Sequence, residues 1–401
     1  MLVTHNRSVA YRGVWALLAL ALLVATPLAT AQVSTFDVPQ AKSALLMVAE
    51  TGQLLYAKNI DEPLPPASLV KMMTLLLAFE AIERGEVRMD ETVRVSRNAA
   101  SVSGSKVWLA EGDRLTVEQM MAAVAIQSAN DASIVLAERI AGSEEAFVAR
   151  MNEKARMLGL QGTHFSNSHG LPTVVAGDEP GLMSARDAAL IGRELVLRYP
   201  EVLEWTKLWN KPLGPGTRNP IVLENTNRLV LTSSLPIDGL KTGHTSEAGY
   251  QLVATAEQDG LRLISVVMGT QTAAEREDAT ERLLSYGFNA FDRVVVGDDE
   301  TFTVRIPDAP ADSAVRTLSP VTVLVPRTQV AQLNTYVELD SELRAPVEDG
   351  QRVGELVVRI NDEEAVRVPV YSDGDVPRAG FFRRQWMAFT QWLSSLFSGD
   401  N

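Results

Sequence analysis

The sequence is organised around one stretch, Pro65-Pro66-Ala67-Ser68-Leu69-Val70-Lys71-Met72-Met73-Thr74, which leads into the apolar run Leu75 to Ile82. Proline fixes φ and disfavours helix in the preceding residue, so the two prolines predict an extended entry. Good helix formers follow, and Gly85 stands where a glycine commonly ends a helix. Ser68 is therefore expected in the first turn of a helix, with Lys71 on the same face. A serine nucleophile with a lysine base needs such a pair at a helix N-terminus.

This motif by itself leaves a purely structural interpretation open. A capping serine and a surface lysine fit the same spacing, and the chain holds a second copy in Ser103-Gly104-Ser105-Lys106. Few apolar residues follow that copy before Glu111-Gly112-Asp113, so it is predicted to be a loop. Other motifs in the chain are therefore needed to distinguish a catalytic Ser68–Lys71 pair from a helix cap.

Composition excludes several classes of function. The 401 residues allow two domains, and the net charge of −13 argues against nucleic acid as a partner. The absence of cysteine excludes disulfides, cysteine nucleophiles and thiolate metal sites, and it leaves the redox compartment open. Four scattered histidines without a His-Glu-x-x-His motif predict no metal site, and nothing suggests a cofactor.

The N-terminus predicts export. Arg7 and Arg12 precede the apolar run Val14 to Ala25, and the small residues Ala29-Thr30-Ala31 follow. This layout is typical of a cleavable signal peptide over residues 1–31. An uncleaved membrane anchor is the alternative, but the apolar run is shorter than the roughly 20 residues that span a bilayer.

Residues 32–290 are predicted to form one α+β domain, an antiparallel sheet with helices and a helical subdomain. A hairpin is expected near the start, central helices follow, and late strands alternate with turns. The sheet would then join the two ends of the domain. The elements that carry this prediction are strands at Ser43–Ala49, Gln53–Ala57, Ile237–Thr245, Tyr250–Ala256 and Leu261–Gly269, and helices at Leu115–Ile126, Ala132–Ile140 and Ala274–Ala290.

Two different segments follow. Residues 291–376 contain short alternating strands separated by Gly, Pro and Asp, which predict a small β-rich domain without catalytic groups. Residues 377–401 carry aromatic and leucine side chains at helical spacing behind Arg378, Arg383 and Arg384. Such an amphipathic helix is expected to lie in an anionic membrane interface, although docking on the core is the alternative.

Two further motifs favour catalysis. Ser128-Ala129-Asn130 is predicted between two helices, and Lys241-Thr242-Gly243 within a strand. Each is weak alone, since Ser96-Arg97-Asn98 is a chance copy of the first. The order Ser-x-x-Lys, Ser-x-Asn, Lys-Thr-Gly is hard to obtain by accident.

Together these motifs resemble those of the serine D,D-peptidases, and most closely the low-molecular-mass D-alanyl-D-alanine carboxypeptidases related to penicillin-binding proteins 5 and 6. The resemblance runs essentially end to end, from the signal peptide through the three motifs and the β-rich domain to the tail. It implies a β-lactamase-like fold and hydrolysis of peptidoglycan stem peptides ending in D-Ala-D-Ala. It also implies inhibition by β-lactams and a peripheral position on the periplasmic face of the inner membrane.

The local chemistry and the resemblance together assign expected roles. Ser68 is the nucleophile, Lys71 its base and Ser128 a proton relay to the leaving amine. The oxyanion hole is expected from backbone N–H groups of Ser68 and His244. Substrate-binding residues are expected at Asn130, Lys241, Thr242, Gly243, His244 and Arg276.

Two positions qualify this picture. Thr226 stands where penicillin-binding protein 5 carries an active-site arginine, which puts the strength of carboxylate binding in doubt. His169 lies near a loop histidine of the family, and we interpret it as structural.

Three alternatives remain. A β-lactamase shares the motifs, but the chain has no Glu-x-x-Leu-Asn element between Asn130 and Lys241 to supply a deacylation base. A D,D-endopeptidase uses the same mechanism. A non-catalytic wall-associated scaffold could keep the fold, although nothing structural demands both lysines.

Overall fold

The computed structural model describes residues 36–172, 179–214, 220–297, 301–329 and 333–381. The predicted signal peptide over residues 1–31 lies outside these ranges, and so does the predicted tail helix beyond residue 381. Neither prediction is tested by the fold.

A five-stranded antiparallel sheet with the order β2-β1-β9-β8-β7 forms the centre of the first part of the chain. Ser43 of β1 pairs with Met268 of β9, so the N-terminal hairpin adds to strands that follow it by more than 200 residues. This is the predicted closure of the sheet by the two sequence ends. The strands are β1 (Ser43–Val48), β2 (Leu54–Lys58), β7 (Ile237–Thr245), β8 (Gly249–Gln258) and β9 (Leu261–Thr270).

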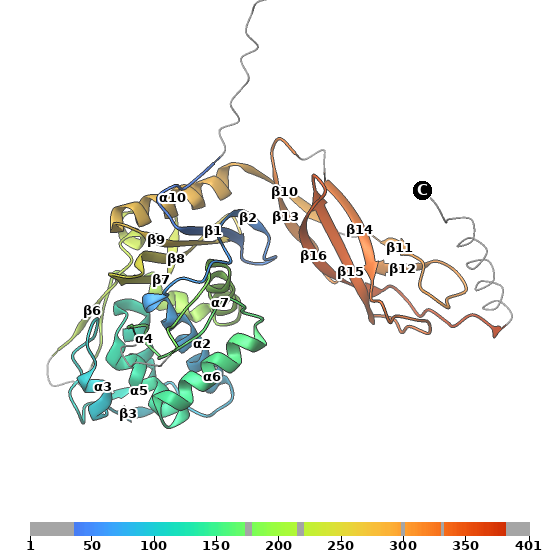
Figure 1. Ribbon diagram of the computed structural model, residues 1–401. Helices are drawn as coiled ribbons and strands as arrows, with labels where there is room; N and C mark the ends of the chain where they lie inside the picture. Colours follow the sequence, from blue (N-terminus) through green and yellow to red (C-terminus); the bar gives the residue numbers. More distant parts are fainter. Residues whose placement is uncertain (1–35, 173–178, 215–219, 298–300, 330–332, 382–401) are drawn as a thin grey trace, which may run out of the picture. The chain divides into compact units, whose positions relative to one another are not determined.

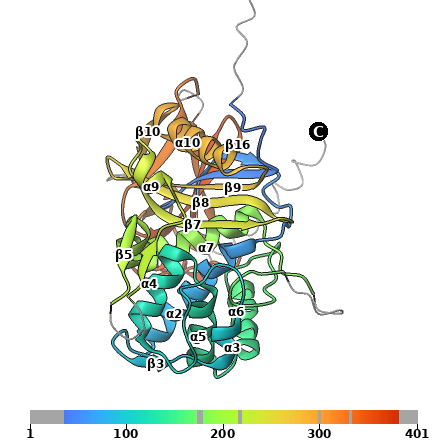
Figure 2. The ribbon, with the colours of Figure 1, turned by 90° about the vertical axis from the view of Figure 1, so that its left-hand side faces the viewer.

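Helices cover both faces of this sheet (Figures 1 and 2). The helix α10 (Ala273–Asn289) packs on β8 and β9, and α7 (Ala185–Arg198) packs on β1 and β9. A helical group lies below β7 in both views, and it contains η1 (Ala67–Val70), α2 (Lys71–Glu83), α3 (Arg97–Ser101), α4 (Val117–Gln127), α5 (Asn130–Ala141) and α6 (Glu144–Met157). The remaining short elements are β3 (Thr92–Arg94), β4 (Arg114–Thr116), η2 (Pro200–Val202), α8 (Leu203–Thr206), β5 (Asn210–Pro212), β6 (Val222–Glu224) and α9 (Leu229–Thr232).

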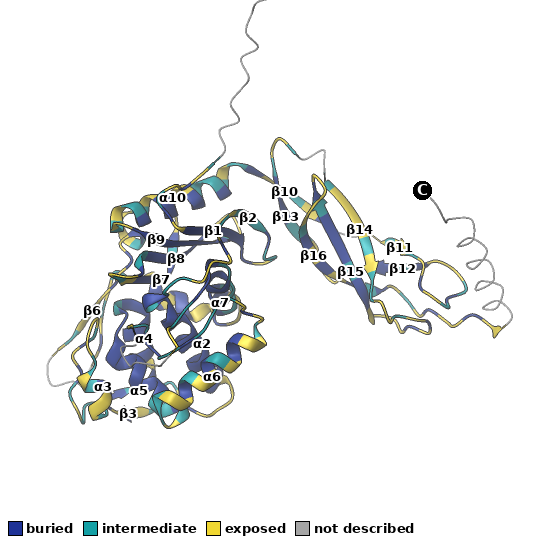
Figure 3. Cartoon of the chain, viewed as in Figure 1, coloured by how far each residue is buried: buried dark blue, intermediate teal, exposed yellow. Residues whose placement is uncertain are grey.

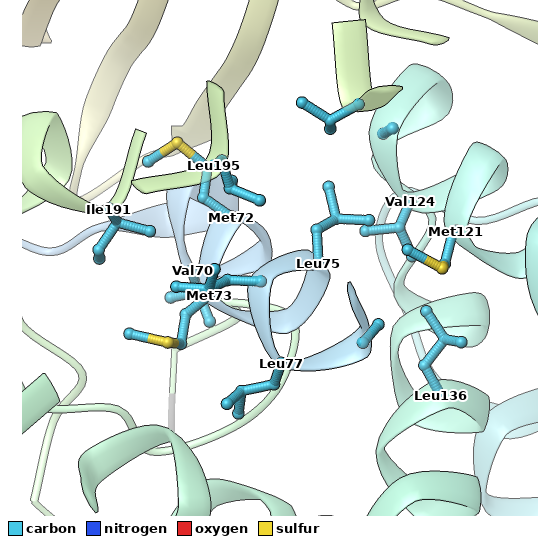
Figure 4. Close-up of a cluster of buried hydrophobic side chains, with 14 of the residues drawn as sticks. Val70, Met72, Met73, Leu75, Leu77, Met121, Val124, Leu136, Ile191 and Leu195 are labelled. Carbon is cyan, nitrogen blue, oxygen red and sulfur yellow. The ribbon is translucent and has the colours of Figure 1, made fainter. Parts of the chain in front are cut away.

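The central helix α2 is buried on nearly every side. All residues from Lys71 to Ala81 are buried, as the dark ribbon in Figure 3 also shows. Figure 4 shows its side chains among those of α4, α5 and α7, including Met121, Val124, Leu136, Ile191 and Leu195. Each large side chain buried in this way contributes about 1.5–3 kcal/mol. The helix that begins at Lys71 is therefore held in place from all sides.

One helix start differs slightly from the prediction. The predicted helix Leu115–Ile126 begins later, because Leu115 belongs to β4 and the Thr116 hydroxyl caps α4 in a reciprocal pair with Gln119. At the start of α7 the Ser184 hydroxyl accepts from Asp187 N at 3.1 Å. The Asp187 carboxylate accepts hydrogen bonds from Gly162 N and the Thr163 hydroxyl, both at 2.8 Å.

After α10 the described structure is all β. A two-stranded sheet pairs β10 (Phe291–Val296) with β13 (Val321–Pro326). A five-stranded antiparallel sheet has the order β11-β12-β16-β15-β14. Its strands are β11 (Phe302–Val304), β12 (Ser313–Arg316), β14 (Leu333–Leu339), β15 (Arg352–Ile360) and β16 (Glu363–Ser372). We did not predict β12, which is only four residues long, or β14, whose residues are largely exposed.

Candidate active site

Ser68 lies in η1, one turn before α2, and its backbone is held by close packing. The preceding Ala67 has φ of +45°, a left-handed conformation that non-glycine residues rarely adopt. On Gly170, with φ of +86°, an added methyl would stand 1.9 Å from the Ala67 carbonyl oxygen. Only glycine allows the loop to come this close. The serine is thus set on a strained turn clamped by a second segment.

The Lys71 amine is at the centre of the site. Its Nζ lies 2.9 Å from Ser68 Oγ, 2.7 Å from Asn130 Oδ1 and 2.6 Å from the His169 carbonyl oxygen. Asn130 Oδ1 and the carbonyl can only accept hydrogen bonds, whereas the serine hydroxyl can donate or accept one. A neutral amine satisfies all three, because it donates two hydrogens and turns its lone pair toward the hydroxyl.

The surroundings of Lys71 favour that neutral form. Complete burial is the largest cause that lowers its pKa well below the usual value, and the Lys241 cation lowers it further. Asp131 opposes this shift from the other side. A neutral amine can accept a proton from Ser68.

Ser128 and Asn130 sit at the junction of α4 and α5. Ser128 ends α4 in a left-handed conformation with φ of +61°, and its buried Oγ has no hydrogen-bond partner in the described structure. Such an unpaired buried hydroxyl is costly and therefore uncommon, which makes it a candidate for contact with a ligand. Asn130 is the first residue of α5.

The loop that carries the second Ser-x-x-Lys copy supports this junction. The Ser103 carbonyl accepts from Asn130 Nδ2 at 2.7 Å, and the Ser105 carbonyl accepts from Asn130 N at 2.7 Å. The Asp131 carboxylate in turn accepts from the backbone N–H groups of Val107 and Leu109. The predicted loop is correct, but no sequence pattern indicates that its carbonyls position Asn130.

The strand β7 brings Lys241, Thr242 and Gly243 against the Ser68 segment. A methyl on Gly243 would stand 3.2 Å from the Pro66 carbonyl oxygen, so the two backbones nearly touch. Lys241 is 2 % exposed and donates from Nζ to the Thr242 carbonyl at 2.9 Å. Burial and the nearby Arg276 cation lower its pKa to about 7. His244 follows on the strand, exposed, with its ring centroid 4.0 Å from that of Tyr250.

Arg276 and Thr226 lie on the side of Lys241 and Thr242. Arg276 is 5 % exposed on α10, and its Nε has no partner while Nη2 contacts Glu277 at 3.0 Å. Its charge lowers the pKa of Lys241, which indicates that the two cations are close. The Thr226 hydroxyl lies 2.5 Å from the Thr242 hydroxyl. A neutral hydrogen bond thus occupies the place where the resemblance implies an arginine.

His169 acts through its backbone and a fixed ring. Its carbonyl accepts from Lys71, and its Nδ1 accepts from Leu171 N at 3.2 Å. Its Nε2 is 3.7 Å from Glu144 Oε1. Burial is the largest cause that lowers its pKa to about 3, with the charge of a protonated Lys71 as the second cause, so the ring is neutral at physiological pH. We interpreted this residue as structural, and these contacts fit that role, although the sequence did not reveal its hold on Lys71.

Two features are absent from the described residues. No group of three or more His, Cys, Asp or Glu side chains is arranged to hold a metal ion there. In the same residues, every helix is too short or too polar to cross a bilayer.

Comparisons with known proteins agree across most of the chain. The profile of the D-alanyl-D-alanine carboxypeptidase family of peptidases matches residues 29–272, and that of the penicillin-binding protein 5 C-terminal domain matches residues 311–378. D-alanyl-D-alanine carboxypeptidase DacC of Escherichia coli (strain K12) is 37% identical over 394 residues, which is 94% of this chain and 96% of the relative. DacF of Bacillus subtilis (strain 168) is 36% identical over 347 residues, 85% of this chain and 87% of the relative.

Solved structures show the same likeness. Penicillin binding protein 5 from Haemophilus influenzae superposes with a TM-score of 0.73 at 31% identity, covering 84% of this chain and 98% of that one. Penicillin binding protein 6B from Escherichia coli gives a TM-score of 0.65 at 32% identity, covering 82% and 94%.

Proposed function

Because this chain belongs to the D-alanyl-D-alanine carboxypeptidase family, we propose that the cluster around Ser68 and Lys71 is its active centre. The protein is a D-alanyl-D-alanine carboxypeptidase, a hydrolase that acts on peptidoglycan peptides ending in D-Ala-D-Ala and binds β-lactams. The resemblance inferred from the three motifs is confirmed, and so is an α+β domain followed by a β-rich one.

In the proposed acylation step, Ser68 Oγ attacks the carbonyl carbon between the two D-alanines. The hydroxyl proton moves to Lys71 Nζ, which lies 2.9 Å away. The C–N bond then breaks, the last D-alanine leaves as an amine, and the remaining peptide stays on Ser68 as an ester. The support for Lys71 as base is its neutral form, which burial and the Lys241 cation favour, and its position, which Asn130 and the His169 carbonyl hold.

Ser128 is the proposed proton relay. The leaving nitrogen needs a proton as the C–N bond breaks, and the proton taken up by Lys71 is the available one. The Ser128 hydroxyl is buried beside the cluster without a partner, so it is free to receive that proton and pass it on. Water then cleaves the ester, and Lys71 again takes the proton.

The remaining residues are proposed to bind the substrate. Backbone N–H groups of Ser68 and His244 stabilise the developing oxyanion, and Asn130 uses the second hydrogen of its amide nitrogen for the substrate backbone. Lys241, Thr242 and the glycine that follows them receive the terminal carboxylate. The buried Arg276, with an unpaired Nε, adds positive charge on the same side.

One observation carries this proposal: Lys71 Nζ joins Ser68, Asn130 and the His169 carbonyl in one buried cluster. The test is Ser68→Ala, measured by D-alanine release from a D-Ala-D-Ala peptide and by labelling with a fluorescent penicillin. Both signals should disappear while the fold persists. Unchanged release and labelling would support a scaffold instead.

The same assay separates the related enzymes. The chain has a curated relative of 30% identity over 217 residues, 53% of this chain, that is a D-alanyl-D-alanine endopeptidase of Pseudomonas aeruginosa. The mass of the product distinguishes loss of a terminal D-alanine from cleavage of a cross-link. Penicillin should be released slowly from Ser68, and turnover of many molecules per second would indicate a β-lactamase.

The location of the enzyme is also a proposal. The signal-like pattern of residues 1–31 and the amphipathic sequence pattern after Val376 together support a peripheral position on the periplasmic face of the inner membrane. Deleting the residues after Val376 should release an active enzyme into the soluble fraction. A truncated protein that stayed with the membrane would contradict this and indicate an uncleaved N-terminal anchor.

A further inference from the structure

Two consecutive backbone carbonyls connect the loop around His169 to the helix α2. The His169 carbonyl accepts from Lys71 Nζ at 2.6 Å, and the Ser168 carbonyl accepts from the Thr74 hydroxyl at 2.7 Å. Lys71 and Thr74 are three residues apart on α2, so they lie on one face of the helix, and both are completely buried. The place of this short backbone segment therefore helps to fix the place of the Lys71 amine.

Glu144 holds the same segment from a third element of the fold. It is the first residue of α6, a helix whose start is capped by the Ser143 hydroxyl. Its Oε1 accepts from Ser168 N at 3.0 Å and from the Ser168 hydroxyl at 2.6 Å. Ser168 is completely buried, so both of these donors would be costly to leave without an acceptor. The carboxylate thus fixes the residue whose carbonyl meets Thr74.

The His169 ring faces the same carboxylate. Its Nδ1 accepts from Leu171 N at 3.2 Å, so the neutral ring carries its hydrogen on Nε2. Nε2 lies 3.7 Å from Glu144 Oε1, which is longer than a hydrogen bond but favourable for a carboxylate that faces an N–H group. Glu144 therefore acts on this segment mainly through Ser168, and it also favours the observed orientation of the His169 ring.

We propose that Glu144 is a positioning residue for acylation, which fixes the Ser168–His169 backbone and thereby holds the Lys71 amine beside Ser68. The proposal rests on the proposed function, in which Lys71 takes the proton of Ser68. One oxygen of Glu144 accepts both hydrogen bonds from Ser168, and the amide oxygen of a glutamine can accept the same two with less strength. The role is therefore one of hydrogen-bond acceptance, and a glutamine should preserve most of it.

The experiment compares Glu144→Ala with Glu144→Gln and with Glu145→Ala. Glu145 is the other acidic residue in the first turn of α6 and is exposed, so its loss removes a similar charge from the same helix end. The rate of acylation by penicillin is measured up to saturation and corrected for the folded fraction. Glu144→Ala should lower the maximal rate about tenfold or more, since a misplacement of about 1 Å can cost on the order of a hundredfold. Glu144→Gln should remain within about threefold of the wild type, and Glu145→Ala should match it.

The acid limb of the pH–rate profile is a second readout, which a loss of stability alone would not move. The titratable or charged groups that face Lys71 are Lys241 on β7, Asp131 on α5 and the His169 ring, and the variants change none of them. The His169 carbonyl is an acceptor that favours the ammonium form of Lys71. When Glu144→Ala releases this carbonyl, the pKa of Lys71 should fall and the acid limb should move to lower pH. The other two variants should keep the wild-type limb.

A smaller change supplies a second test of the same contact. Ser168→Ala removes the 2.6 Å hydrogen bond but keeps the one from the backbone, so it should cause the same two changes at a smaller size. If Glu144→Ala does not fold, an unchanged rate and limb in Ser168→Ala overturn the proposal.

The results of the main comparison separate this proposal from the proposed function. A wild-type maximal rate and limb in Glu144→Ala, an equal loss in Glu145→Ala, or a Glu144→Gln variant as slow as Glu144→Ala overturns the positioning role alone, because penicillin still labels Ser68 of the wild type. If penicillin leaves the wild type unlabelled, the proposed function fails and the positioning role with it.

Discussion

Replacing Gly170 with alanine is expected to slow acylation of Ser68 about a hundredfold. The new methyl would stand 1.9 Å from the Ala67 carbonyl oxygen, and real Cβ atoms essentially never come within 3.0 Å, so one segment must move by at least 1.1 Å. Movement of the Ala67 segment displaces Ser68. Movement of the Gly170 loop displaces the His169 carbonyl, which accepts from Lys71 at 2.6 Å. A misplacement of about 1 Å can cost on the order of a hundredfold in rate.

The substitution also has a conformational cost, which a control can isolate. Alanine at φ of +86° costs about 1–2 kcal/mol in folding free energy, whatever it touches. Gly159 has φ of +71° with no atom within 4 Å of an added methyl, so Gly159→Ala pays the same conformational cost without a clash. It should lose similar stability from strain but acylate normally.

The assay for this pair is the second-order rate of labelling by a fluorescent penicillin, corrected for the folded fraction. Denaturant unfolding of both variants supplies that fraction and the two free energies. If Gly170→Ala labels at the wild-type rate and loses no more stability than Gly159→Ala, the argument that this contact positions Ser68 and Lys71 is refuted.

Three further predictions concern charge and hydrogen bonding. Acylation should fall as acidic pH protonates Lys71, and Lys241→Gln should move this limb to higher pH, because it removes a cation that lowers the pKa of Lys71; an unmoved limb in a pH–rate profile would contradict this. Ser128→Ala should reduce the rate of peptide hydrolysis by about a hundredfold or more. It should not lower the free energy of unfolding, since the Ser128 hydroxyl has no hydrogen-bond partner in the described structure; a decrease above about 1 kcal/mol would indicate that such a partner exists. Glu80→Gln should lower the free energy of unfolding by about 3 kcal/mol, because it leaves the buried ammonium of Lys154, 2.6 Å from Glu80 in the wild type, without its carboxylate. Denaturant unfolding measures this loss, and a loss no larger than that of Lys154→Met would argue against the pair.

Much of the fold and of the chemistry could be read from the sequence, because the signals are local. The strand predicted at Leu261–Gly269 lies within the observed β9, Leu261–Thr270, since a mostly apolar segment that follows a turn suits a buried strand. The helix Lys71–Glu83 was predicted from its prolines, its helix formers and Gly85, which has a positive φ. Ser68 was expected in its first turn but lies in the 3-10 turn just before it. The short β12 and the exposed β14 lack such a pattern and were missed.

Other properties of the site depend on contacts between distant segments. The sequence placed Lys71 one turn after Ser68, but its neutral form arises from burial and from Lys241. Its position is held by two acceptors that lie 59 and 98 residues away. The Ser103-Gly104-Ser105-Lys106 loop carries no catalytic pattern, yet its carbonyls hold Asn130.

The division has a physical cause. Backbone propensity and hydrophobic periodicity act between near neighbours, so the sequence alone determined the elements, the order of the three motifs and the reaction class. The pKa of Lys71 and the close approach of Gly170 to Ala67 depend on which atoms from distant segments are buried together. Only the tertiary structure decided those, and with them how Lys71 becomes a base.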